Sequence, residues 1–166
     1  MSATKRDFNL VNDILRAAHA PWVKVAYLPD AGPAGAYLAT ELVTATPHRL
    51  RELLYDGAIR LCRQAVAALD AGDVERSADR FARARCVVQH LQASLGAADA
   101  TPASRRFADL YEQVHRRLLE ADFYRKREAA NQTILILNCQ RPAWRALVAE
   151  SAGTGPGGGD ATGWIG

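Results

Sequence analysis

The broadest run of hydrophobic positions lies in residues 46–69, TPHRLRELLYDGAIRLCRQAVAAL. On a helical wheel of about 100° per residue, the apolar residues of this run form two adjacent stripes. An ordinary surface helix has an apolar arc of somewhat more than about 100°, and this arc is roughly twice as wide. We therefore expect a helix that is covered on two sides, and another protein could supply one cover. The first stripe holds Leu50, Leu53, Leu54, Gly57, Ala58, Leu61, Ala65 and Ala68, and the second holds Tyr55, Ile59, Cys62, Val66 and Leu69.

Start and stop signals predict three further helices after this one. The pair Thr46–Pro47 is a helix start, and Gly72 can adopt the left-handed conformation that ends a helix. Asp73 and the pair Thr101–Pro102 are the next two start signals, and each helix that follows them carries one apolar stripe of ordinary width. The predicted helices are 47–69, 74–95, 102–121 and 125–149, and their short connections are typical of an all-α, antiparallel up-down four-helix bundle.

The two ends of the chain differ from this central part. Residues 7–19 have apolar side chains at helical spacing and predict a short amphipathic helix. That helix either docks on its own bundle or caps a binding groove. Residues 151–166 are rich in glycine and are expected to be disordered, and Trp164 and Ile165 within them are either a docking motif or incidental. The predicted organisation is an N-terminal extension (1–35), a helical-bundle domain (36–150) and a glycine-rich tail (151–166).

Composition and charge restrict the class of protein. Hydrophobic residues make up 49% of the 166 residues, charged residues 23%, and the net charge is +3, which is ordinary for a soluble globular domain. Arginines are spread along the chain, so no basic block indicates nucleic-acid binding. We expect Cys62, Cys86 and Cys139 to be small buried side chains in a reducing compartment. The sequence also predicts no membrane-spanning segment and no signal peptide, and therefore a cytosolic protein.

The sequence contains no constellation that indicates catalysis. The four histidines have no metal-ligand spacing, and no glycine loop precedes a helix in the way a phosphate site requires. Glu52 and Asp56 lie four residues apart on one helix face, where pairing with Arg49 and Arg60 is the expected role. We therefore predict a protein that is not an enzyme and has no cofactor and no metal site.

Two motifs, in the right order and at the right spacing, resemble a known family. Residues 43–47, VTATP, followed by residues 54–60, LYDGAIR, form the first motif, and residues 116–121, RRLLEA, form the second. Together they are similar to the signature of FliS, the flagellar secretion chaperone for flagellin, and the resemblance extends over about residues 36–149. The further matching positions are Ser94, Leu95, Leu110, Tyr111, Arg141 and Trp144.

The resemblance implies a fold and a function. FliS proteins are small cytosolic helical bundles that bind the disordered C-terminal segment of flagellin, prevent premature polymerisation and assist delivery to the flagellar type III export apparatus. Flagellin would then be the partner, and a component of the export gate a further one. Departures from the family pattern are Asp122, where asparagine is usual, Pro142, which predicts a kink near residues 138–141, and the long extension 1–35.

The family's client lies along apolar grooves on the bundle surface, and the second stripe of residues 46–69 offers such a surface. The candidate groove residues are Tyr55, Ile59, Cys62 and Val66, and the resemblance places Tyr37 at the rim. One alternative puts residues 55–66 in the core of the bundle itself, opposite the fourth helix. Another is a structural or adaptor protein that homodimerises through its wide apolar helix, so the oligomeric state is left open between a monomer and a weak homodimer.

Overall fold

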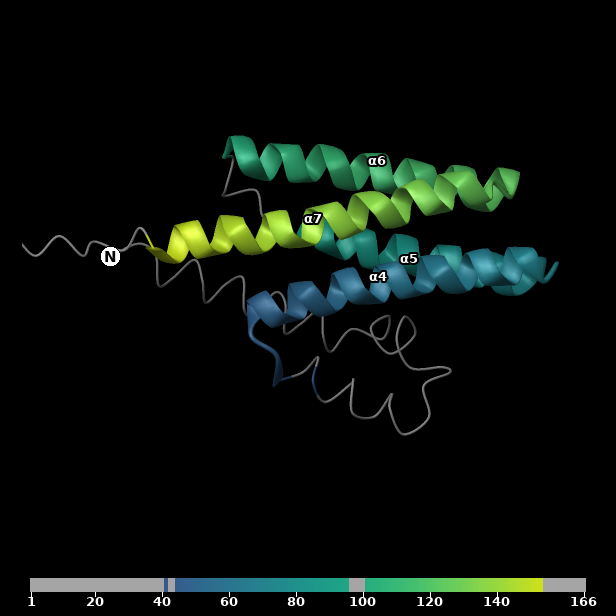
Figure 1. The fold of residues 1–166 in the computed structure, drawn as a ribbon, viewed down its shortest axis with the longest axis horizontal. Helices are drawn as coiled ribbons and strands as arrows, with labels where there is room; N and C mark the ends of the chain where they lie inside the picture. The colour runs from purple at the N-terminus through teal and green to yellow at the C-terminus, as the bar shows by residue number, and fades with distance from the viewer. Residues whose placement is uncertain (1–40, 42–43, 96–100, 154–166) are drawn as a thin grey trace, which may run out of the picture.

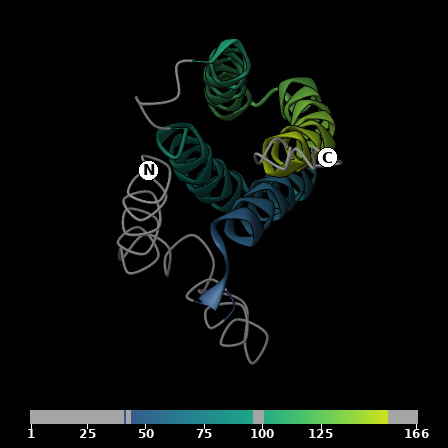
Figure 2. The same cartoon turned by 90° about the vertical axis from the view of Figure 1, so that its left-hand side faces the viewer.

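The computed structural model describes residues 41, 44–95 and 101–153, and within them it contains four long α-helices and no strand. The helices are α4 (Pro47–Asp70), α5 (Val74–Ala93), α6 (Pro102–Tyr124) and α7 (Arg127–Gly153). Each helix packs against two neighbours, in the cyclic order α4–α5–α6–α7, and the end-on view in Figure 2 shows the four helices in a ring. The predicted all-α four-helix bundle is confirmed. The expected N-terminal helix at residues 7–19 and most of the glycine-rich tail lie outside the described residues, and the domain boundaries stay a prediction.

Side-chain caps begin three of the helices where the sequence predicts them. The hydroxyl of Thr46 accepts a hydrogen bond from the Arg49 N–H at 3.3 Å, and the hydroxyl of Thr101 accepts one from the Ser104 N–H at 3.1 Å. Each of these caps satisfies a backbone donor that the first helical turn leaves without a partner. Asp73 caps α5 in the same way, and Gly72 has a φ of 73°, in the left-handed region that the turn between α4 and α5 requires.

The boundary between α6 and α7 lies later than the sequence predicts. The expected break at residues 122–124 is helical, and α6 ends instead at Tyr124, followed by Arg125 with the left-handed φ of 54°. No residue in 122–124 forbids a helix, so the turn forms where one residue can enter the left-handed conformation and close it. The Lys126 N–H then donates to the Ala121 carbonyl at 3.1 Å.

Helix α7 continues through Pro142 to Gly153. Proline removes the hydrogen bond to the carbonyl four residues earlier, which belongs to Asn138. Both Pro142 and Asn138 are exposed, so water can satisfy the Asn138 carbonyl and the helix does not have to end there. The helix expected over residues 125–149 thus runs through the proline, and the kink expected near residues 138–141 stays a prediction.

The centre of the bundle is a buried pair of phenols that connects diagonal helices. Tyr55 of α4 and Tyr111 of α6 are both completely buried and share a short hydrogen bond between their hydroxyl groups. Burial raises the pKa of both side chains, so they remain neutral. The core around them also contains the fully buried residues Leu61, Phe81, Val87, Val88, Leu91, Val114, Leu118 and Leu137.

Ion pairs connect α7 to α4. Arg141 of α7 lies 2.8 Å from Asp56 of α4, and Arg145, one helical turn further on, pairs with Glu52. The hydrogen bond from Arg145, followed by that from Arg49, lowers the pKa of the Glu52 carboxyl. These ion pairs hold one side of α7 against α4. The side of α7 that faces away from α4 can therefore line a groove.

Asp122, the residue that departs from the family pattern, has a partner in the bundle. Its carboxylate lies 2.7 Å from the guanidinium of Arg85 on α5, and both side chains are mostly buried. A carboxylate can accept a charge-assisted hydrogen bond here that an asparagine amide would make only more weakly. The departure therefore strengthens the contact between α5 and α6.

The cysteine prediction is correct for one residue and wrong for two. Cys62 is buried in the core, and burial raises the pKa of its thiol to about 12. Cys86 and Cys139 are exposed, because each lies on the outward side of its helix, where a small apolar residue carries no packing requirement. Across the described ranges no group of three or more potential ligands could hold a metal ion. None of the described helices is long and apolar enough to cross a membrane.

Candidate binding groove between α6 and α7

The structure places the predicted groove residues of α4 inside the bundle. Tyr55 and Cys62 are fully buried, Ile59 is 4% exposed, and Val66 is half-buried against the core. Tyr37 lies outside the described residues. Contact of these residues with another protein stays a prediction, but in this conformation Tyr55, Ile59 and Cys62 do not form an open surface.

The wide apolar arc of α4 is covered on two sides, as expected, and helices of the bundle itself provide both contacts. α5 packs along one side of α4 and α7 along the other, and Tyr55 reaches across the centre to α6. The sequence interpretation that placed residues 55–66 in the bundle core therefore describes their position better than the open-groove interpretation does.

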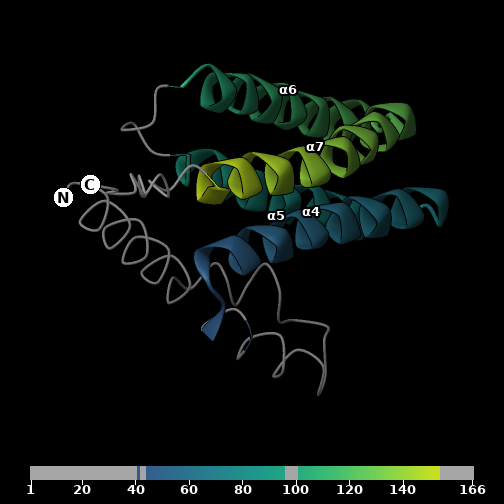
Figure 3. The same ribbon diagram turned by 60° about the vertical axis from the view of Figure 1, so that its left-hand side comes forward.

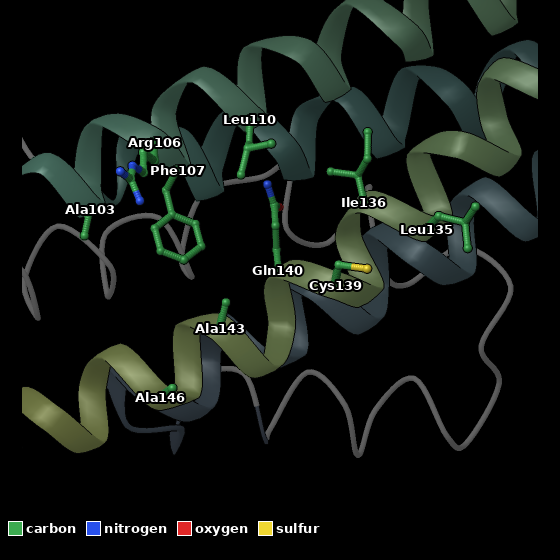
Figure 4. Close-up of a pocket in the computed structure, with 10 residues that line it drawn as sticks. All are labelled: Ala103, Arg106, Phe107, Leu110, Leu135, Ile136, Cys139, Gln140, Ala143 and Ala146. Carbon is green, nitrogen blue, oxygen red and sulfur yellow. The ribbon is translucent and has the colours of Figure 1, made fainter.

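An open apolar groove lies instead between α6 and α7. The two helices meet at their short connection and separate toward the start of α6 and the end of α7 (Figures 1 and 3). The groove between them encloses about 660 Å³, within the range of about 300–1,000 Å³ that is typical of ligand pockets. Its walls are Ala103, Arg106, Phe107 and Leu110 of α6, and Leu135, Ile136, Cys139, Gln140, Ala143 and Ala146 of α7 (Figure 4).

The α7 wall is a second apolar stripe that the sequence interpretation missed. Leu135, Cys139, Ala143 and Ala146 follow one another at intervals of four, four and three residues and are all exposed, with Leu135 64% exposed. Such spacing puts them on one helix face, on the side of α7 away from Leu137, which is fully buried in the core. The sequence interpretation assigned one inward stripe to this helix, and it missed the second stripe because alanine and cysteine give a weak hydrophobic signal.

The opposite wall and the floor are held in place by stacked side chains. Phe107 packs edge-on against Trp144 of α7 with 5.7 Å between ring centroids. The guanidinium of Arg51 lies 3.8 Å from the centre of the Trp144 ring, and its Nη2 donates to the Leu91 carbonyl at 3.0 Å. This stack ties α4, α5, α6 and α7 together beneath the groove and makes it a pre-formed surface.

Gln140 places an unpaired amide in the groove. It is only 3% exposed, and neither its Oε1 nor its Nε2 has a hydrogen-bond partner in the described part of the chain. In Figure 4 its side chain extends from α7 toward α6, between Phe107 and Leu110. A side-chain amide has both an acceptor and donors, so it can pair with the N–H and C=O of a peptide or with a polar group on an incoming side chain.

Replacing Gln140 with methionine is expected to stabilise the free protein by about 1–3 kcal/mol, the cost of a buried polar group without a partner. Methionine has a similar length and volume and no amide, so the packing should be preserved. Urea unfolding followed by circular dichroism measures the gain. Gln132→Met on the same helix is the matched control, and it should not stabilise because Gln132 accepts a hydrogen bond from Arg117. An unchanged or lower stability of Gln140→Met would show that the amide is satisfied in the free protein.

The chemistry of the groove is that of a binding surface. Its lining is apolar except for the Gln140 amide and the Arg106 guanidinium, and it offers neither a nucleophile with an adjacent base nor a metal-ligand set. A surface of this kind accepts the apolar face of a helix or an extended apolar strip.

Comparison with known proteins gives matches that agree with one another. The family model "Flagellar protein FliS" matches residues 31–151. A protein named flagellar secretion chaperone FliS in Bacillus subtilis is 31% identical over 90 residues, which are 54% of this chain and 66% of that protein. The protein of the same name in Salmonella typhimurium is 27% identical over 107 residues, or 64% of this chain and 79% of that one. The Vibrio cholerae protein is 22% identical over 111 residues, 67% and 82% of the two chains.

Proposed function

The chain belongs to the FliS family of flagellar secretion chaperones, and from this premise we propose that its client is the C-terminal segment of flagellin. In this proposal the protein works in the cytosol, prevents premature polymerisation of flagellin and assists its delivery to the flagellar type III export apparatus. A component of the export gate would then be its second partner. The family is one of chaperones, in agreement with the prediction that the chain is not an enzyme.

The open α6–α7 groove is the observation that supports a client-binding role. It is pre-formed, apolar and exposed, and Leu135 presents most of its side chain to solvent there. A large exposed apolar surface on a folded protein indicates a partner. An unfolded export client has apolar residues to bury and unpaired backbone groups that the Gln140 amide can satisfy.

The mechanism that follows is coupled folding and binding. A disordered segment orders on the groove, and that ordering costs several kcal/mol of the contact energy. The resulting affinity is moderate for the area buried, which suits a chaperone because the client has to be released at the export apparatus. No covalent step and no cofactor are needed.

The homodimer hypothesis receives no support from the described part of α4. Its apolar residues are buried or half-buried against α5, α6 and α7, and its fully exposed positions are mainly polar, including Arg49, Arg60 and Arg63. The surface on which that hypothesis depended is used within the bundle.

Calorimetric titration of the full chain with a synthetic flagellin C-terminal segment tests the proposal. We expect saturable one-to-one binding with a negative heat-capacity change, because apolar surface is buried. The absence of heat at two temperatures, together with the absence of a complex on gel filtration, would reject flagellin as the client.

A further inference from the structure

Few side chains of residues 154–166, TGPGGGDATGWIG, can make contacts. Trp164 and Ile165 are the only large apolar residues, and Asp160 is the only charged one. We propose that Trp164 and Ile165 of this same chain occupy the α6–α7 groove when no client is bound. The inference rests on the proposed function only in naming flagellin as the competitor for the groove.

The length of the tail matches the distance that it has to cover. Ala143, in the middle of the groove, lies ten residues before Gly153 on α7, which is about 15 Å at the helical rise of 1.5 Å per residue. Trp164 lies eleven residues after Gly153, and a glycine-rich segment of that length has a root-mean-square span of about 17–20 Å. A linker whose span matches the separation of two sites gives an effective concentration in the millimolar range.

The groove contains a partner for each group that the tail offers. The indole of Trp164 combines a large apolar surface with one N–H donor, and the buried Oε1 of Gln140 is an acceptor without a partner. Ile165 can pack between Leu110 and Leu135. Asp160 carries the opposite charge to Arg106, the charged residue of the groove wall.

The order of these groups along the tail also fits the direction of the groove. In Figure 4, Ala103, Arg106 and Ala146 lie at the end of the groove that is nearer to the C-terminus of α7, and Leu135 and Ile136 lie at the other end. A chain that leaves α7 and turns back along the groove reaches Arg106 first and Gln140 next. Asp160 precedes Trp164 in the sequence, so both contacts can form in one pass.

Docking of the tail would regulate access to the groove. The apparent dissociation constant of a client increases by the reciprocal of the fraction of molecules whose groove is open. A tail that fills nine grooves in ten would therefore weaken client binding about tenfold. It would also shield the exposed apolar stripe of α7 until a client displaces it.

Two native cysteines allow a direct test without any client. Cys139 is exposed and lines the groove, whereas Cys86 is exposed on α5, the helix diagonal to α7. The test protein carries Ile165→Cys with Cys86→Ser, and its matched control carries Ile165→Cys with Cys139→Ser. Cys62 can stay, because its thiol is fully buried in the core, out of reach of the tail and of glutathione.

Disulfide formation in dilute protein with oxidised glutathione is followed by mass spectrometry of unreduced peptides. We expect the bond to Cys139 to form at least tenfold faster than the bond to Cys86. Trp164→Ser added to the test protein should remove this advantage, which separates docking from the mere proximity of Cys139 along the chain. Equal rates for the two cysteines, or a rate to Cys139 that Trp164→Ser leaves unchanged, would overturn the proposal.

Addition of the flagellin segment then separates the two proposals. If both hold, the segment slows disulfide formation at Cys139. If the tail reacts through Trp164 and the segment has no effect on the rate, the tail inference stands and flagellin does not compete for this groove. If the rate to Cys139 depends on neither Trp164 nor the segment, the tail inference fails whatever calorimetry shows for the client.

Discussion

Leu135→Asp is expected to lower the affinity for the flagellin C-terminal segment at least tenfold while the bundle stays folded. The side chain is 64% exposed in the free protein, and surface substitutions of this kind usually change stability by less than about 0.5 kcal/mol. A client in the α6–α7 groove would cover the Leu135 side chain, whose burial contributes about 1.5–3 kcal/mol. In the variant a carboxylate would be buried without a partner, and a loss of about 1.4 kcal/mol already corresponds to tenfold.

Val74→Asp is the matched control for that experiment. Val74 is 42% exposed on the first turn of α5, outside the groove, and an acidic residue is favourable at a helix N-terminus. The control should bind the segment as the unmodified protein does, with an unchanged circular dichroism spectrum. Unchanged binding by Leu135→Asp would remove the α6–α7 groove as the client site. Equal losses in the two variants would indicate a general effect of negative charge.

Local chemistry explains why the helices could be predicted from the sequence. Thr46, Asp73, Thr101 and Gly72 act through their own side chains or backbone conformation, so their signals do not depend on the rest of the fold. The end of α6 has no such signal. Arg125 closes the helix in the left-handed conformation, which is uncommon for a non-glycine residue and which the sequence does not signal.

The site could be predicted only in part, because periodicity shows which faces are apolar but not what covers them. In a ring of four helices, each helix packs against two neighbours and against the core, so the bundle itself buries the wide apolar arc of α4. On α7 the face of Leu135 and Cys139 lines the open groove, and no other helix of the described residues covers it. That difference depends on which helices are adjacent and how far they separate, and neither can be obtained from one helix alone.

The residues that carry the family resemblance have architectural contacts in this structure. Tyr55 of the first motif bonds to Tyr111, and the adjacent Asp56 pairs with Arg141 at 2.8 Å. Trp144 stacks beneath Arg51 at 3.8 Å. A signature of this kind identifies the bundle, whereas the groove that we propose for the client is lined largely by residues outside the signature. Recognition of the family therefore predicts the fold more directly than it predicts the contact residues.

Ile59→Asp is expected to unfold the bundle. Ile59 is 4% exposed and belongs to the core cluster, so the substitution both removes packing and buries a carboxylate without a partner. Such changes cost about 4 kcal/mol or more, which approaches the whole stability of many domains, about 5–15 kcal/mol. Loss of the helical circular dichroism signal, or a much lower urea midpoint, checks this expectation. A folded Ile59→Asp protein of normal stability would show that Ile59 reaches solvent.

The conservative variant Ile59→Val decides whether the second stripe of α4 also touches the client. It should cost about 0.5–1.5 kcal/mol of stability and leave the protein folded, so calorimetry can be done on an intact bundle. Unchanged affinity would assign Ile59 to the core alone, as its burial indicates. A tenfold loss of affinity would require the client to open the contact between α4 and a neighbouring helix, because a folded bundle with Ile59 inside presents no surface there for a client to lose.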